Sequence, residues 1–247
     1  MKKILLGTIG LVAVGVAAPA VAADLPQRMP AAAPAVMMPY VYDWTGFYIG
    51  GNGGWGSSRN CWGNFTNFIV PEGCNSRSGG MIGGQGGYRW QMGQFVFGLE
   101  AEGDWTSMRG SLPSVAFPGT TNSSKVTSVG LFTGQVGWAM DAALFYLKGG
   151  AALTNNNFLN YNTLSGVGLY YATTHKLGAT VGVGFEYGFT PNWSAGIEYD
   201  HLFMGNANNS FSCVAGCAAV VNTISQDVDM FTVRVNYKFG GPVVARY

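Results

Sequence analysis

From residue 44 onward, apolar and polar side chains alternate in short stretches that are separated by connections. The clearest stretch is the last one along the chain, where Phe231, Val233, Val235, Tyr237 and Phe239 alternate with Thr232, Arg234, Asn236 and Lys238. A period of two places successive side chains on opposite faces, so this stretch predicts a strand with one apolar and one polar face. Such a strand suits a wall between lipid and a polar interior. Because an open edge would leave backbone groups unpaired in hydrocarbon, it needs partners that close a barrel.

The same pattern recurs in stretches long enough for the roughly 9–11 residues of a tilted transmembrane strand. We expect eight strands, over 45–56, 79–90, 95–106, 126–139, 143–154, 174–189, 194–205 and 227–239. Their connections alternate, with short ones after the second, fourth and sixth strands and long ones over 57–78, 107–125, 155–173 and 206–226. This alternation predicts an all-β fold, an eight-stranded antiparallel up-and-down transmembrane β-barrel with long extracellular loops and short periplasmic turns.

The alternation also assigns charged residues to the barrel interior. We expect an interior ionic network of six acids and five bases, formed by Arg89, Glu100, Glu102, Asp104, Lys148, Lys176, Glu186, Glu198, Asp200, Arg234 and Lys238. Side chains fill an eight-stranded barrel, and buried charges cost several kcal/mol each unless they are paired. A nearly balanced set of inward charges therefore indicates a lumen filled by ion-paired side chains. A catalytic carboxylate pair is the less favoured alternative, since structural networks also gather charges. The fourth stretch departs from the pattern, because Val129 and Leu131 fall on its inward face.

The beginning of the chain predicts export. Met1-Lys2-Lys3 is followed by an apolar run over 4–18 and by small residues up to Ala23, the pattern of a secretory signal peptide. An uncleaved anchor is disfavoured, because the run is short for a membrane helix. We expect a signal peptide over 1–23, a Pro/Ala-rich periplasmic linker over 24–43, the barrel over 44–240 and a C-terminal periplasmic tail over 241–247.

The composition agrees with a lipid-solvated exterior. Charged residues make up 10% of the chain, aromatic residues 14%, and there are 38 glycines, which suit sharply bent or closely packed strands. Of 13 Lys and Arg residues two lie in the signal peptide, which leaves 11 against 12 acidic residues. This balance gives no support for a nucleic-acid partner. Aromatic residues near strand ends predict interfacial girdles: Trp44, Trp90, Trp105, Trp138, Trp193, Tyr199 and Tyr237.

Four cysteines fall into two local pairs, Cys61 with Cys74 and Cys213 with Cys217. In an exported protein this pattern favours two disulfides, although four cysteines allow three connectivities. A zinc site built from all four thiolates is the alternative. It is less favoured, because neither pair has C-x-x-C spacing and because exported thiols oxidise.

The two histidines give little support for catalysis. A rim enzyme would use His175 or His201, the latter together with Asp200 and Ser210. Neither histidine has a local partner arrangement that would fix a tautomer and activate a nucleophile. One imidazole alone is also no haem site. We therefore expect no enzyme, no cofactor and no metal.

The long connections carry two further features. The first two long connections have an excess of positive charge, with Arg59, Arg77, Arg109 and Lys125 against Glu72. These residues could contact lipopolysaccharide phosphates. We favour the alternative that they are ordinary solvated charges. The third connection holds an apolar set that is either an adhesive surface or an extension of the strands beyond the membrane: Phe158, Tyr161, Leu164, Tyr170 and Tyr171.

Several segments resemble a known family. They are 44–54 (WTGFYIGGNGG), 83–88 (GGQGGY), 95–102 (FVFGLEAE), 148–152 (KGGAA) and 233–239 (VRVNYKF). Together they are similar to small outer-membrane barrels of the opacity-like, OmpA-type group, and within it to the alpha-proteobacterial RopB-like major surface proteins, a porin-like family. The resemblance implies roles in envelope integrity, adhesion, immunogenicity or haem binding.

Two departures from that family stand out. The fourth strand has Thr133 and Gln135 where relatives commonly carry arginines, so the interior pairing differs. The chain also continues past Phe239, which makes Tyr237 and Phe239 an internal signal for the assembly machinery, unless Tyr247 takes that role.

The sequence thus predicts an integral outer-membrane protein of a Gram-negative bacterium with a structural role and surface loops for adhesion or ligand contact. Expected partners are outer-membrane lipid, lipopolysaccharide, the assembly machinery and a host or surface ligand. A narrow porin-like channel is the alternative, if water passes the inward Gly178, Gly182, Gly184 and Gly196. A rim enzyme is a third and weaker one.

Overall fold

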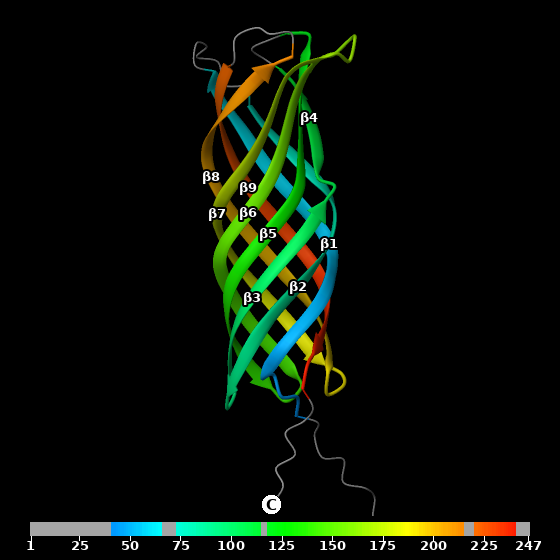
Figure 1. Ribbon diagram of the computed structural model, residues 1–247, viewed down its shortest axis with the longest axis vertical. Coiled ribbons are helices and arrows are strands. Elements are labelled where there is room, and N and C mark those ends of the chain that lie inside the picture. Colours follow the sequence, from blue (N-terminus) through cyan, green and yellow to red (C-terminus); the bar gives the residue numbers. More distant parts are fainter. Residues whose placement is uncertain (1–40, 66–72, 115–117, 215–219, 241–247) are drawn as a thin grey trace, which may run out of the picture. The chain divides into compact units, whose positions relative to one another are not determined.

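One antiparallel sheet closes on itself to form a barrel (Figure 1). The computed structural model describes residues 41–65, 73–114, 118–214 and 220–240, so the predicted signal peptide and C-terminal tail lie outside the described residues. The strands are β1 (Gly46–Phe65), β2 (Gly73–Met92), β3 (Phe95–Thr106), β4 (Arg109–Pro113), β5 (Thr120–Met140), β6 (Ala143–Asn162), β7 (Gly168–Gly188), β8 (Trp193–Cys213) and β9 (Val220–Lys238). No helix among these residues is long and apolar enough to cross a membrane.

The ring contains eight strand positions, because β3 and β4 share one. β3 pairs with β2 and β5, and after a break at 107–108 the short β4 continues between the same two neighbours. β1 closes the ring by pairing with both β2 and β9. The predicted eight-stranded antiparallel barrel is therefore confirmed.

The three predicted short turns lie at one end of the barrel, which we call the turn end. Gly93 with φ 63° and Asp141 with φ 52° occupy the turns after β2 and β5. Glycine adopts this left-handed conformation freely, and aspartate tolerates it better than most residues do. Residues 189–192 form the third turn, between β7 and β8.

At the opposite end, the loop end, the strands continue far into the segments that the sequence predicts as long loops. Strand covers 57–65, 73–78, 109–113, 120–125, 155–162, 168–173, 206–213 and 220–226. The prediction was wrong here because Asn, Ser, Thr and Gly are frequent in these segments, so no continuous apolar face marks them as strand. Of the apolar set of the third connection, Leu164 lies in the turn between β6 and β7, and the other four residues lie in strand.

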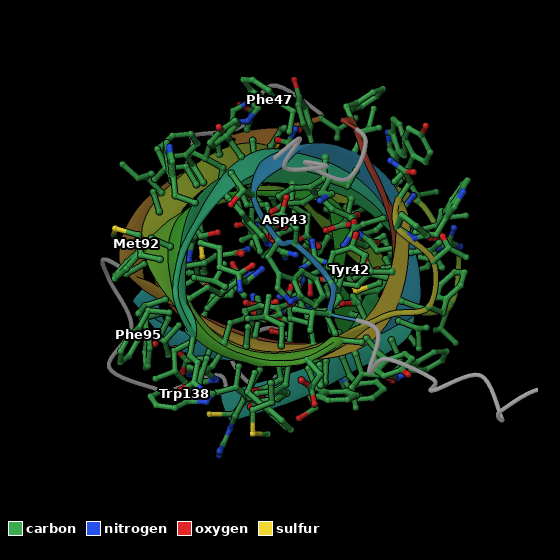
Figure 2. The ribbon with its side chains drawn as sticks, turned by 90° about the horizontal axis from the view of Figure 1, so that it is seen from below. Tyr42, Asp43, Phe47, Met92, Phe95 and Trp138 are labelled. Carbon is green, nitrogen blue, oxygen red and sulfur yellow. The ribbon has the colours of Figure 1, made fainter. Side chains whose placement is uncertain are left out.

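Outward-facing apolar side chains form a continuous zone around the outside of the barrel, which we call the apolar band. In Figure 2, Phe47, Met92, Phe95 and Trp138 point away from the barrel axis. The band covers 47–55, 82–92, 95–105, 132–140, 145–153, 177–189, 193–203 and 231–239. These segments match the length of a tilted membrane-spanning strand. We call the strand segments beyond the band, toward the loop end, the extension.

Candidate functional site: the filled barrel interior

The turn end of the barrel is closed by residues that precede the first strand. Tyr42 and Trp44 are buried, and in Figure 2 Tyr42 and Asp43 lie within the ring of strands. The Tyr42 backbone N–H donates to the Asp141 carbonyl at 3.2 Å. The Lys238 ammonium donates to the Asp43 carbonyl and lies 3.4 Å from its carboxylate. We call residues 41–45 the mouth plug.

The mouth plug changes two expectations. Residues 41–43, placed by the sequence in the linker, lie in the barrel mouth. Trp44, predicted as a girdle residue, is only 2% exposed, because it faces Arg89, whose guanidinium carbon lies 5.5 Å from its ring. On the inner side of the mouth plug, a cavity of about 10 Å³ lies between Tyr42, Trp44 and Arg89, which has room for about one water.

Above the mouth plug lies a buried group of charged side chains that we call the ionic core. Its centre is the Lys148 ammonium, which has four carboxylate neighbours on two strands. Oxygens of these carboxylates lie 2.6 Å (Glu198), 3.2 Å (Glu102), 3.3 Å (Asp200) and 3.6 Å (Glu100) from Nζ. Because the ammonium is shielded from water by the barrel wall, these contacts are necessary to offset the cost of burying it.

Two arginines complete the ionic core. Arg234 bridges Glu198 and Glu100, and its Nη2 lies 2.6 Å from Glu100 Oε2. Arg89 Nη2 lies 2.9 Å from Glu186 Oε2, and its Nε donates to Gln135 at 3.3 Å. Gln135, one of the family departures, is thus a neutral partner for an arginine.

Two tyrosines, which the sequence interpretation did not include, add hydrogen bonds to carboxylates of the ionic core. Tyr48 donates to Glu100 at 2.6 Å and Tyr146 donates to Glu198 at 2.5 Å. The guanidinium carbon of Arg89 also lies 4.4 Å from the Tyr48 ring and 5.6 Å from the Tyr146 ring. Each phenol therefore supplies a donor to a buried carboxylate and an aromatic face to a buried cation.

All eleven residues of the predicted interior network are buried, but they do not form a single group. The ionic core holds the six acids and three of the five bases. Lys238 lies at the mouth, paired with Asp43. Lys176 lies nearer the loop end, where the charges acting on it are those of Arg77 and Asp227. The sequence did not separate these two bases from the rest, because strand parity gives the face of a residue and not its height in the barrel.

Three carboxylates of the ionic core approach the geometry of a metal site. Ligand oxygens of Glu100, Glu102 and Glu198 lie within 4.8 Å of one another. However, Lys148 contacts all three and Arg234 contacts two of them. The cations of the protein itself therefore occupy the place that a metal ion would take.

Inward glycines make room for side chains of the ionic core and its surroundings. A Cβ on Gly184 would lie 2.2 Å from the Tyr146 ring, and one on Gly182 would lie 2.2 Å from Asp200 Oδ1. A Cβ on Gly178 or Gly196 would lie 2.2 Å or 2.4 Å from a backbone carbonyl oxygen of the next strand. The glycine positions that would have admitted water in a channel are thus filled by other protein atoms.

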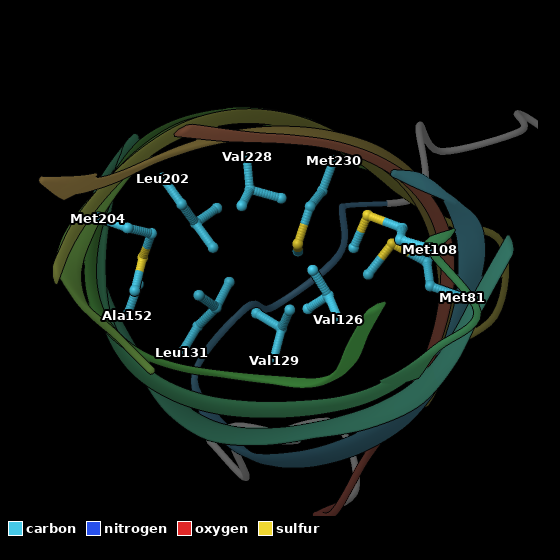
Figure 3. Close-up of a cluster of buried hydrophobic side chains, with 10 residues drawn as sticks. All are labelled: Met81, Met108, Val126, Val129, Leu131, Ala152, Leu202, Met204, Val228 and Met230. Atoms are coloured by element: carbon cyan, nitrogen blue, oxygen red, sulfur yellow. The ribbon is translucent and has the colours of Figure 1, made fainter. Parts of the chain in front are cut away.

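A ring of apolar side chains, which we call the belt, crosses the lumen between the ionic core and the extension. Figure 3 shows them pointing inward from strands all around the wall: Met81, Met108, Val126, Val129, Leu131, Ala152, Leu202, Met204, Val228 and Met230. The inward placement of Val129 and Leu131, which looked irregular in the sequence, is explained by this belt. No residue of the belt is more than 6% exposed.

Beyond the belt, most of the inward side chains of the extension are polar, and we call these buried polar side chains the polar layer. Gln226 links two members of this layer, since its Nε2 donates to Ser58 at 3.4 Å and to Asn156 at 3.1 Å. The described members are Ser58, Asn60, Arg77, Asn122, Ser124, Thr154, Asn156, Lys176 and Gln226.

The histidines lie on the outside of the barrel. His201 Nδ1 lies 2.7 Å from Asp229 Oδ1, and Tyr199 donates to the same oxygen at 2.7 Å. Asp200, the partner considered from the sequence, is fully buried on the inner face, so the barrel wall separates it from His201. His175 is exposed, and the Ser210 side chain lies outside the described residues.

Cys61, Cys74 and Cys213 lie at the loop end. Cys61 and Cys74 are direct backbone partners in the pairing of β1 with β2. Cys74 and Cys213 are both disulfide-bonded, and no described cysteine is free. Cys217 lies outside the described residues. These findings agree with disulfides and leave no described thiol for the zinc alternative.

The charged and apolar residues of the predicted loops divide between the two faces of the barrel wall. Arg59 and Arg109 are exposed and Lys125 is half-buried, whereas Arg77 points inward and is 1% exposed. Glu72 lies outside the described residues. In the third connection Phe158 is also buried, whereas Leu164 and Tyr171 are exposed.

The expected assembly signal lies at the turn end of β9. The rings of Tyr237 and Phe239 are 5.2 Å apart and edge to face, and Phe239 is 54% exposed on the outer surface. Trp193 packs against Tyr237 with ring centroids 5.1 Å apart. The two residues are therefore displayed as an outward aromatic pair.

Known proteins share both the sequence pattern and the fold. Residues 9–239 match the family described as the outer membrane protein beta-barrel domain. The 31 kDa outer-membrane immunogenic protein of Brucella melitensis is 30% identical over 97% of this chain and 100% of that protein. Among solved structures, the outer membrane protein OprG from Pseudomonas aeruginosa covers 81% of this chain and 99% of its own, with 11% identity and a TM-score of 0.53. Neisserial surface protein A covers 79% and 98%, with 15% identity and a TM-score of 0.41.

Proposed function

Because this chain belongs to the outer membrane protein β-barrel family and is an integral outer-membrane protein, we propose that it is a closed barrel with a structural role. It stabilises the outer membrane through its apolar band and holds the extension at the cell surface. The observation that carries this proposal is the filled lumen. The mouth plug, the ionic core and the belt follow one another along the barrel axis.

A closed lumen disfavours the alternative of a narrow diffusion channel. An ion would have to displace Lys148 or Arg234 from buried carboxylates and then cross the apolar belt, and both steps are costly. We expect planar bilayers that contain the refolded protein to show no conductance steps, with heat-modifiable gel mobility as proof of folding and a conducting porin as positive control. Reproducible ion-dependent steps from the folded protein would establish the channel instead.

We also propose that the hairpin of β6 and β7 carries a surface contact. Its tip exposes Leu164 by 97% and Val167 by 59%, next to the exposed Tyr171. Asn162 Oδ1 accepts hydrogen bonds from the Leu164 and Ser165 backbone N–H groups at 3.0 Å, so the apolar side chains are presented on an ordered turn. The relative described as immunogenic supports display of such a tip at the cell surface.

A pair of assays separates the structural role from the contact. A strain that lacks the protein should take up more of a hydrophobic dye, and both the wild type and a variant with Leu164→Ser and Val167→Ser should restore the barrier. The same variant should lose attachment to host cells. Failure of the wild type to restore the barrier would overturn the structural role, and unchanged attachment would overturn the contact.

Three further proposals rest on where the residues concerned lie in the barrel. We propose that Tyr237 and Phe239 form the signal read by the assembly machinery, because both lie outward at the end of the last strand. We propose that the exposed Arg59 and Arg109 face lipopolysaccharide, since they lie just beyond the apolar band. We propose no enzymatic activity, because the barrel wall separates Asp200 from His201.

A further inference from the structure

Arg77 has no partner for its charge among the described residues. It is 1% exposed, and its Nε, Nη1 and Nη2 atoms all lack a hydrogen-bond partner. Burying an unpaired guanidinium costs several kcal/mol, and proteins rarely retain such a group without a use for it. Burial lowers the pKa of Arg77 to about 9, so the group stays charged at neutral pH.

The Arg77 side chain extends into the barrel rather than along its own strand. Its guanidinium carbon lies 5.7 Å from the ring of Phe158, on β6. β2 and β6 are not neighbours in the sheet, because β3 with β4 and then β5 lie between them. The guanidinium therefore lies within the lumen, with an aromatic ring near it as in many arginine sites.

The surroundings of Arg77 offer donors rather than negative charge. Asn60 Nδ2 and Ser124 Oγ are also buried and without partners, and Lys176 adds a second buried cation within electrostatic reach of Arg77. Gln226 Oε1 is an unpartnered acceptor, but it is neutral. No described carboxylate points into the polar layer, since Asp227 faces outward and the acids of the ionic core lie across the belt.

We propose that the polar layer is a binding site for a small oxyanion, either free phosphate or sulfate or the terminal phosphate or sulfate group of a larger molecule, which Arg77 binds. A guanidinium donates two parallel hydrogen bonds to such an anion, a geometry that an ammonium lacks. Asn60 and Ser124 supply further donors, and Lys176 supplies charge. The belt closes the site toward the turn end.

Titration calorimetry on the refolded protein with inorganic phosphate tests the site. We expect Arg77→Met to weaken phosphate binding about 10–100-fold, the usual range for one charge-assisted hydrogen-bonding group. Lys125→Met is the matched control, because Lys125 lies on the outer face of β5 and should leave binding unchanged. Equal binding by both variants, or no binding by the wild type, would overturn the proposal.

Thermal unfolding in chloride buffer is a second test. The unfolding midpoint of Arg77→Met should shift in one direction if Arg77 binds an anion and in the opposite direction if it has a structural role. Without an oxyanion, Arg77→Met removes an unpaired buried charge and should raise the unfolding midpoint, whereas loss of a structural ion pair would lower it. Glu72→Gln tests whether that acid pairs with Arg77, and we expect it to have no effect. A lowered midpoint in both variants would assign Arg77 to an internal ion pair and overturn the proposal.

A third measurement identifies the source of the anion. Glucose 6-phosphate carries a terminal phosphate on a bulky group, so its binding through Arg77 would support recognition of a phosphorylated surface molecule. Binding of inorganic phosphate alone would support a site for free anions. Sulfate and phosphate also stabilise proteins generally, so a stabilisation that is equal in the wild type and in Arg77→Met would indicate an adventitious ion only.

Discussion

The ionic core and the polar layer lie inside the same wall of strands, yet their buried cations have opposite surroundings. In the ionic core each cation meets at least one carboxylate, and Lys148 meets four. In the polar layer Arg77 has no partner among the described residues. The belt separates the two regions and keeps the carboxylates of the one away from the cations of the other.

This difference shows how one barrel can combine a fixed interior with a binding site. Charged groups that are hydrogen-bonded to one another hold a single arrangement. Groups that lack partners gain free energy when a ligand supplies them, because the cost of burying them has already been met during folding. We therefore assign stability to the ionic core and recognition to the polar layer.

The largest effect is expected when the ionic core loses its central cation. Lys148→Met leaves Glu100, Glu102, Glu198 and Asp200 facing one another without the ammonium. We expect a loss of about 3–5 kcal/mol in the free energy of unfolding, the usual cost of breaking a buried ion pair from one side. Denaturant unfolding of the refolded protein in detergent micelles measures the loss.

Two further variants make this prediction specific. Lys125→Met removes a lysine from the outer, half-buried face of β5 and should change stability by less than about 0.5 kcal/mol. The double variant Lys148→Met with Glu198→Gln should recover part of the loss, because one carboxylate becomes neutral. A double variant no more stable than Lys148→Met alone would show that charge is not the cause.

A smaller effect is expected from filling the space beside Tyr146. In Gly184→Ala the new Cβ would lie 2.2 Å from the Tyr146 ring, so the ring must move and its hydrogen bond to Glu198 must lengthen. We expect a cost of about 1–3 kcal/mol, as for other overpacked interiors.

Gly103→Ala is the control for this substitution, because a Cβ there meets no atom within 4 Å. Denaturant unfolding of both variants measures the difference, and near-UV circular dichroism reports the packing of Tyr146. Equal stability of the two variants would mean that the glycines do not make room for the ionic core.

Much of the fold was predictable from the sequence. The alternation of apolar and polar residues fixed which side chains of each strand face inward, and the short connections fixed the turn end. The ionic core was predicted in the same way, because charged residues on the strand face opposite the lipid must lie in the barrel lumen. Tyr48 and Tyr146 were missed, although each has inward parity, because tyrosines were interpreted as girdle residues.

Other features could be recognised only in the three-dimensional structure. The height of Lys176 and Arg77 above the belt depends on strand stagger, which the pattern within one strand does not contain. The extension was taken for loops because its inward face is mainly polar and its outward face lies beyond the apolar band, so the alternation of apolar and polar residues that identifies the other strand segments is missing. Residues 41–43 were taken for linker and Trp44 for a girdle residue, because the burial of Tyr42 and Trp44 depends on the barrel that they close.

The smallest expected effect concerns the pH dependence of the polar layer, and it arises from Lys176. Burial and the nearby charge of Arg77 lower the pKa of Lys176 to about 8, and Asp227 opposes this shift. In the unfolded chain a lysine titrates near 10.4, so between these values the unfolded state binds more protons than the folded state. Stability should therefore rise with pH across this window.

Comparison of the wild type with Lys176→Met isolates this contribution from other groups that titrate at the same pH. We expect the wild type to gain about 1 kcal/mol relative to the variant between pH 8 and pH 10, a modest gain because salt at the loop end screens the charges. Phosphate binding should weaken over the same range as the site loses a positive charge. A stability difference between the two proteins that does not change with pH would mean that Lys176 keeps its proton, and would remove it from the proposed site.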